Sequence, residues 1–205
     1  INNQDISYDN IKTGTLYDKR DGKEYKTIKI GRQWWMAENL AYKMSKGCMA
    51  YNNDANNVDK YGYLYNWKTA INACPDGWKL PSDYDWKYME IKIGMPEWAS
   101  DRTGNRTYKY IGNILAGEDW AYNSDIRDFP TNNSTGFSAI PAGYYSNKFE
   151  NKGYYSGWWT STLGEGDSAW GRAIGDDFTK KNGYPQIYRG KGSIYMYISV
   201  RCIKK

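Results

Sequence analysis

Histidine is absent from this chain of 205 residues. Its absence excludes nucleophilic sites that pair serine or cysteine with histidine, and it excludes zinc sites with histidine ligands. Long apolar runs are also missing, since no stretch approaches the ~20 residues that a membrane-spanning helix needs. The 28 basic and 23 acidic residues are interspersed and give a net charge of +5 without blocks of one sign. We therefore expect no nucleic-acid partner and no membrane-spanning segment.

Phenylalanine is scarce, whereas the other aromatic residues are abundant: 4 Phe stand against 21 Tyr and 10 Trp, alongside 21 Gly. Tyr and Trp combine an apolar body with a polar group, so such a chain can fill a core and still present a hydrogen-bonding surface. Tyr and Gly can equally well populate the strands and turns of a secreted β-rich domain. Composition leaves both interpretations open.

Alternating residues predict strands at both ends of the chain. The pair Asp21-Gly22 and the alternating run after it predict a β-hairpin over residues 15–31. Near the C-terminus, every second residue of 193–202 is apolar. This pattern predicts a strand with one face in the core and with two tyrosines and Arg201 on the outer face.

Between these strands, apolar residues at helical spacing predict two main helices. The first covers residues 64–74, and Pro75 stops it. The second begins after Ser82, which can cap its N-terminus, and ends at Gly94. A shorter helical turn is expected around residues 111–115.

The length suits one large domain with an N-terminal extension. Residues 1–14 are polar and weakly patterned, so we expect them to form an extension or a docking strand. Residues 15–205 then form a single α+β domain, with two main helices packed on short antiparallel strands and a loop-rich C-terminal half.

Seven segments, in order from about Gly14 to the C-terminus, carry a resemblance. They are 21–31 (DGKEYKTIKIG), 35–40 (WMAENL), 61–67 (YGYLYNW), 74–82 (CPDGWKLPS), 135–143 (TGFSAIPAG), 158–162 (WWTST) and 199–205 (SVRCIKK). Together they resemble the Fibrobacter succinogenes major paralogous domain family of bacterial extracytoplasmic proteins. The resemblance implies a C-type-lectin-like fold, related to that of formylglycine-generating enzymes, in which a long loop region carries binding.

The resemblance also implies a disulfide and a compartment. The family pattern pairs Cys74 with Cys202, and such a bond indicates an oxidising environment. A further cysteine of the pattern is missing, which leaves Cys48 as a free, buried thiol. The chain begins at Ile1 without Met, as expected of a mature protein whose targeting segment has been removed. We therefore expect a secreted or surface-anchored bacterial protein.

Two acidic segments are candidates for a metal. Residues 52–59 are rich in Asn and Asp, whose oxygens calcium favours, but they lack the ligand order of an EF-hand. Asn and Asp also form turns, and Asp176 and Asp177 point in different directions if they lie on a strand. We therefore assign no metal ligand and no cofactor, with calcium as the alternative.

The C-terminal half holds the candidate ligand-binding residues. Flat aromatic rings beside arginine and aspartate offer stacking and directional hydrogen bonds, as carbohydrate or protein contacts require. Trp158 and Trp159 are adjacent, so on a strand one must face inward and the other outward. The candidate set is Tyr155, Trp170, Arg172, Asp176, Asp177, Tyr184, Tyr188, Arg189 and Tyr195.

These observations favour a non-catalytic binding or adhesion module that recognises a carbohydrate or protein ligand through its C-terminal face. The alternative is a self-assembling surface subunit of a pilus, filament or layer, in which residues 1–14 dock on a neighbour's sheet edge. We assign no catalytic residue, because the sequence singles out no pair of carboxylates for acid–base chemistry.

Overall fold

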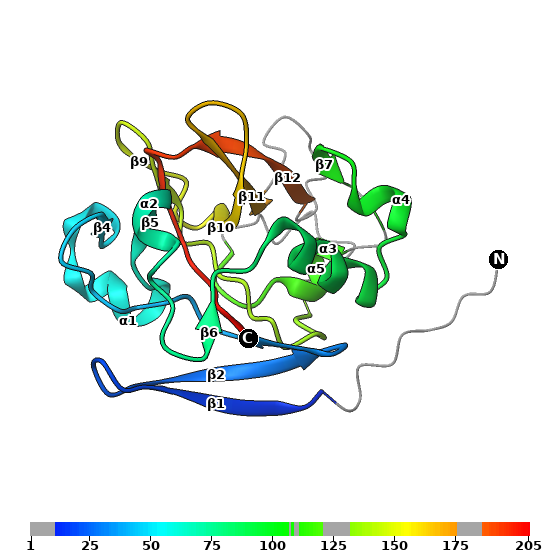
Figure 1. Cartoon of the computed structure of the whole chain (residues 1–205), viewed down its shortest axis with the longest axis horizontal. Coiled ribbons are helices and arrows are strands. Elements are labelled where there is room, and N and C mark those ends of the chain that lie inside the picture. Colours follow the sequence, from blue (N-terminus) through cyan, green and yellow to red (C-terminus); the bar gives the residue numbers. More distant parts are fainter. Residues whose placement is uncertain (1–10, 107, 109–110, 121–131, 176–185) are drawn as a thin grey trace.

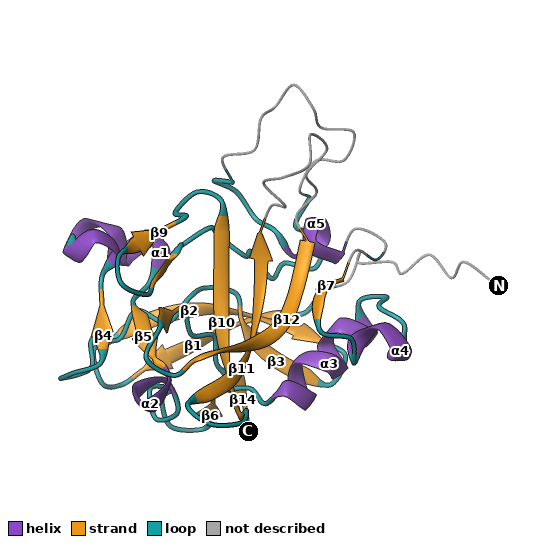
Figure 2. Ribbon diagram, turned by 90° about the horizontal axis from the view of Figure 1, so that it is seen from above, coloured by secondary structure: helices purple, strands orange, loops and turns teal. Residues whose placement is uncertain are grey.

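The computed structural model describes residues 11–106, 108, 111–120, 132–175 and 186–205. In this part of the chain the fold is mainly β, with three antiparallel sheets and only short helices (Figures 1 and 2). The predicted α+β, C-type-lectin-like domain with two main helices on short strands is therefore wrong in its architecture. Within the described ranges, no helix is long and apolar enough to cross a membrane.

The first sheet contains the predicted hairpin and confirms it. The turn closes when the Gly22 amide donates to the Asp18 carbonyl at 2.8 Å, and Gly22 adopts the left-handed φ of 78° that glycine favours. The strand order of this sheet is β1 (Thr13–Asp18), β2 (Lys23–Ile30), β3 (Gln33–Met36), β14 (Ile203–Lys204) and β6 (Trp78–Lys79).

Three of the four strands of the second sheet have eight or nine residues, and these three lie side by side in Figure 2. Its order is β10 (Tyr155–Leu163), β11 (Ser168–Gly175), β12 (Gln186–Ser193) and β7 (Gly104–Arg106). The third sheet is made of short strands from distant parts of the chain. Its order is β4 (Cys48–Met49), β5 (Leu64–Asn66), β13 (Tyr197–Ile198), β8 (Tyr144–Tyr145) and β9 (Phe149–Glu150).

Of the two predicted helices, only the second forms at the expected length. Ser82 caps α3 (Asp83–Lys92) by accepting the Asp85 amide at 3.1 Å, and Asp85 completes the capping box. The first is reduced to α2 (Trp67–Ala70), because Asn66 has an extended backbone and accepts the Thr69 amide as an N-cap. The remaining helices are α1 (Val58–Tyr61), α4 (Glu97–Ser100), α5 (Ile111–Leu115) and the 3-10 turns Tyr51–Asn53 and Ala55–Asn57.

Strand β10 separates two hydrophobic clusters. Trp158 packs on one side, 5.9 Å from Trp86 of α3 between ring centroids. Trp159 points to the other side, into the cluster that contains Ile198 and Cys202. The two tryptophans therefore face opposite sides as expected, but neither faces solvent, because the sheet is covered on both faces here.

The predicted C-terminal strand over residues 193–202 is wrong as one element. The chain turns after Ser193, where the Met196 amide donates to the Ser193 carbonyl, and β13 and β14 pair with different sheets. Arg201 was expected outside but is fully buried. It is buried because residues 199–202 hydrogen-bond to residues 36–40 and to residues 157–159, and because its guanidinium packs against the Phe137 and Trp158 rings. The disulfide between Cys74 and Cys202 forms as the family pattern implied, and it joins residues 128 positions apart.

Candidate functional site

A groove of about 380 Å³ opens on the second sheet, beside the third. We name it the tyrosine groove, after the three tyrosine rings in its lining. Carboxamide groups supply most of the remaining polar surface. The lining consists of Asn105, Tyr144, Asn151, Tyr155, Gly175, Gln186, Tyr188 and Met196.

Strand register brings Tyr155 and Tyr188 to one face of the sheet. Tyr155 of β10 is opposite Gly175 of β11, and Ala173 of β11 is opposite Tyr188 of β12. Because residues two apart on a strand share a face, Gly175 and Ala173 place both tyrosines on the same side. Tyr188 is 40% exposed and so presents its ring to solvent.

Glycines let these rings lie flat on the sheet. A Cβ atom at Gly190 would approach the Tyr188 ring to within 2.4 Å, and one at Gly175 would come within 2.9 Å of Tyr155. Neither position has room for a side chain unless the ring moves. Both rings are therefore held against bare backbone. The outer surface of Tyr188 is left for a ligand, whereas the Tyr155 ring packs edge-to-face with Tyr144.

The chemistry of the groove is polar but uncharged in its described lining. Burial raises the pKa of Tyr155, and burial together with Glu150 raises that of Tyr144. Both phenols therefore stay protonated at neutral pH and act as hydrogen-bond donors and acceptors. Aromatic faces combined with phenol and carboxamide groups can stack on an apolar ring face and bond to the hydroxyls around it.

The structure places the predicted Arg172 and Arg189 on the opposite face of the same sheet. Arg172 donates to Glu90 through Nε at 2.7 Å and to Asp83 through Nη1 at 2.7 Å. Arg189 binds both carboxylate oxygens of Asp83, at 2.9 and 2.8 Å. Both arginines are buried and hold α3 to the sheet, so their side chains are not presented to a ligand.

The Asp83 carboxyl shows the electrostatic consequence of this arrangement. Burial alone would raise its pKa, but hydrogen bonds and charge from Arg189 and Arg172 lower it well below the ordinary value. The cluster is thus a structural ion network rather than a site with a proton to exchange.

The other predicted residues are dispersed. Trp170 lies on the face of the arginines, with the Arg189 guanidinium 4.0 Å from its ring centroid. Tyr195 is 59% exposed, and its hydroxyl donates to Asp167 at 3.2 Å, away from the groove lining. Predictions for Asp176, Asp177 and Tyr184 lie outside the described residues.

Several groove residues could not be found from the sequence. Asn105 enters through β7, which pairs with β12 over a separation of more than eighty positions. Tyr144 enters through β8, which pairs with β13. Such long-range pairings leave no local pattern, although the aromatic pair Tyr144-Tyr145 follows one of the motif segments.

The Asn- and Asp-rich segment 52–59 forms turns. Asp54 accepts the Asn56 amide at 3.0 Å, and the Asn57 side chain donates to the Tyr51 carbonyl at 3.0 Å. Asp59 is exposed and pairs with Lys23. Among the residues that the structure describes, no group of three or more Asp, Glu, Cys or His side chains could hold a metal.

Comparison with known proteins identifies the family. The model of the Fibrobacter succinogenes major domain matches residues 28–204, so the chain belongs to that family. No curated protein and no solved structure matches the chain.

Proposed function

We propose, on the premise that the chain is a Fibrobacter succinogenes major domain, that it is a non-catalytic extracytoplasmic binding module for carbohydrate. The ligand lies in the tyrosine groove. The observation that carries this proposal is the convergence of three tyrosine rings and three carboxamides on one open groove. A sugar ring offers an apolar C–H face for stacking and hydroxyls around its edge, and this groove has a partner for each.

The size of the groove supports a ligand of small-molecule or oligosaccharide dimensions. Its volume of about 380 Å³ falls within the range of ~300–1,000 Å³ that small-ligand sites occupy. The disulfide between Cys74 and Cys202 supports the extracytoplasmic location, because such bonds persist in oxidising compartments. The absence of histidine from the sequence supports a binding role over acid–base catalysis.

The test is a binding screen of the purified chain against plant, host and bacterial polysaccharides. For any polysaccharide bound, Tyr188→Ala is compared with Tyr195→Ala. Both change an exposed tyrosine, but only Tyr188 lines the groove. Loss of one aromatic contact of ~1.5 kcal/mol should weaken binding about tenfold in Tyr188→Ala alone. Equal affinity of both variants and wild type would exclude the groove. Binding of a protein but of no glycan would change the ligand class from carbohydrate to protein.

A second function, assembly into a surface layer or filament, is supported by the position of β1. This strand is at the edge of the first sheet, pairs only with β2 among the described strands, and has four exposed residues. An unpaired edge can accept a strand from a neighbouring molecule. Residues 1–10 belong to the segment proposed to dock on a neighbour, so light scattering on the full chain and on a chain without residues 1–10 tests this. Polymers that disappear on truncation support assembly, and a monomer in both cases excludes it.

A further inference from the structure

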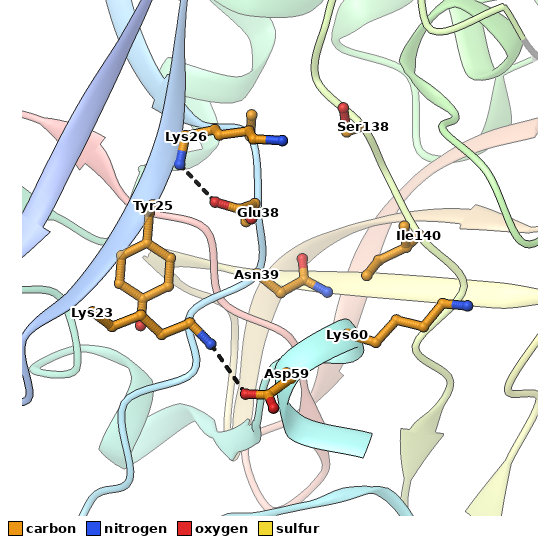
Figure 3. A pocket seen from close by; sticks show the side chains of 10 residues that line it. Lys23, Tyr25, Lys26, Glu38, Asn39, Asp59, Lys60, Ser138 and Ile140 are labelled. Atoms are coloured by element: carbon orange, nitrogen blue, oxygen red, sulfur yellow. Dashed lines mark hydrogen bonds and ion pairs between the residues drawn. The ribbon is translucent and has the colours of Figure 1, made fainter. Parts of the chain in front are cut away.

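A second cavity, of about 210 Å³, lies against β2 and α1 (Figure 3). Strand β2 is on the opposite side of the molecule from β11 and β12 of the tyrosine groove's sheet (Figure 1). Lysines from β2 and α1 stand at its rim, and Glu38 and Asn39 lie between them (Figure 3). Its walls come from four separate parts of the chain. The lining residues are Lys23, Tyr25, Lys26, Ala37, Glu38, Asn39, Asp59, Lys60, Ser138 and Ile140.

The floor of this cavity covers a buried cation. Arg201 is fully buried, and it donates through Nε to the Asn39 side chain at 2.9 Å and through Nη2 to the Ser138 carbonyl at 2.7 Å. Asn39 and Ser138 both line the cavity, so only one residue separates the guanidinium from it. Arg201 also contacts Phe137, whose carbonyl accepts from Nη1 and whose ring centroid lies 4.2 Å from Cζ, and the Trp158 ring, whose centroid lies 5.6 Å from Cζ.

All of these partners are neutral. No carboxylate of the described residues forms an ion pair with Arg201, in contrast to Arg172 and Arg189 on the far side of the core. Burial lowers the pKa of Arg201 to about 9, against the attraction of Glu38. A desolvated charge without an ion-pair contact is costly, so a further negative group in the adjacent cavity, beside Glu38, would be stabilised by it.

The rim adds cations that are free or weakly paired. The Lys26 ammonium makes no hydrogen bond or ion pair with the part of the chain that the structure describes. Lys23 is 3.7 Å from Asp59, whose side chain is 99% exposed, and Lys60 is 2.8 Å from Asp119. Exposed pairs of this kind contribute little and can be exchanged for a ligand.

Glu38 does not cancel this field. Its Oε2 accepts the backbone amide of Lys26 at 2.6 Å, so the carboxylate is turned toward the edge of β2. Lys23 is paired with Asp59 and Lys60 with Asp119, and the exposed Glu118 acts on Lys60 from outside the lining. The charges left at the cavity are then Lys26, Arg201 and Glu38, an excess of one positive charge. That excess matches a carboxylate, whereas a phosphate monoester carries about two negative charges at neutral pH.

We propose that this cavity binds a carboxylate carried on a single sugar unit, which is either a free sugar acid or one unit of a longer chain. The carboxylate lies above Asn39 and Ser138, within reach of Lys26, and the field of Arg201 behind the floor favours it over a neutral group. The volume of about 210 Å³ limits the part of the ligand that enters to about one ring. This site is independent of the tyrosine groove and of the function proposed for it.

The test is titration of the full chain with D-glucuronate, in which amide chemical shifts in NMR report binding. The methyl ester of glucuronate and glucose are the neutral controls. We expect saturable shifts at Glu38, Asn39 and Ser138 with glucuronate only, weakening as salt increases. A separate titration with tri-galacturonate identifies the source of the carboxylate. If tri-galacturonate binds more tightly than the single sugar acid, the carboxylate belongs to a polymer; if it binds more weakly, the carboxylate belongs to a free sugar acid. Equal shifts with the methyl ester, or none with saturating glucuronate, would overturn the proposal.

Charge variants of opposite sign sharpen the test. Lys26→Gln should weaken glucuronate binding about fivefold, the value of one charge contact at ~4 Å in water. Glu38→Gln keeps an oxygen for the Lys26 amide and should tighten binding by a similar factor. Lys204→Gln on β14 makes the same change of net charge outside the cavity and should leave the affinity unchanged. An equal effect of Lys26→Gln and Lys204→Gln would reduce the site to non-specific attraction and refute it.

Discussion

Glu90 binds two arginines inside the domain. Removal of its charge is the change for which the structure makes the sharpest prediction. Its carboxylate accepts two hydrogen bonds from Arg106, at 2.7 and 2.8 Å, and one from Arg172 at 2.7 Å. All three side chains are almost completely inaccessible to solvent. Glu90→Gln keeps the shape but removes the charge, and its NH₂ group would then face guanidinium donors.

The expected loss of stability is large because the network already carries an excess of positive charge. Three arginines, which include Arg189, are held by two carboxylates, Glu90 and Asp83. Removing one partner from a buried ion pair costs ~3–5 kcal/mol. That is a substantial part of the ~5–15 kcal/mol by which folded domains are stable. For a domain of this size, the melting temperature should fall by roughly 6–20 °C.

Urea unfolding with the disulfide intact measures this loss, and thermal melting gives an independent estimate. Glu97→Gln is the matched control, because Glu97 is exposed in the first turn of α4 and its charge has no ion-pair partner among the described residues. We expect the control to lie within ~0.5 kcal/mol of wild type. A loss below ~1 kcal/mol for Glu90→Gln, with an unchanged denaturant slope, would refute the role of the network.

Three further predictions concern acid, thiols and the groove. Because the folded-state pKa of Asp83 is lowered, its contribution to stability is present above about pH 4 and is lost as the pH falls below that value; Asp83→Asn should flatten this acid dependence in urea titrations. Alkylation of the denatured, unreduced chain should modify only Cys48, and reduction of the bond at Cys202 should cost ~5 kcal/mol in the chain-entropy model. Gly190→Ala should displace the Tyr188 ring and weaken groove binding by about the tenfold expected of Tyr188→Ala, while changing the melting temperature little, because the ring can swing into solvent.

The local elements that could be predicted from sequence are those with signals in consecutive residues. The Asp21-Gly22 hairpin and the Ser82 cap of α3 each depend on a few neighbouring side chains and backbone angles. The helix expected over residues 64–74 failed for the same kind of reason: a cap at Asn66 outweighed the apolar spacing and delayed the helix to Trp67.

The candidate site was predicted only in part, because alternation separates residues that are neighbours in sequence. Tyr188 and Arg189 are adjacent, yet Tyr188 lies in the groove and Arg189 in the ion network behind the sheet. The sequence does not show whether a charged residue is paired within the protein, so such a residue looks available to a ligand. Only the tertiary structure, in which paired strands β11 and β12 face α3, showed that Arg172 and Arg189 are already paired with carboxylates of that helix.

The sequence by itself determined the absence of histidine chemistry, the hairpin, the cap of α3 and, through its resemblance to a family, the disulfide between Cys74 and Cys202. These follow from composition, from short-range geometry or from recognisable motifs. Tertiary structure alone decided which side chains meet in the tyrosine groove and why Arg201 is buried beneath a lysine-rimmed cavity. Both depend on strands paired across most of the chain, as when β14 joins β3 and β12 joins β7. Such pairings are selected by the packing of the whole core, which no local stretch of sequence encodes.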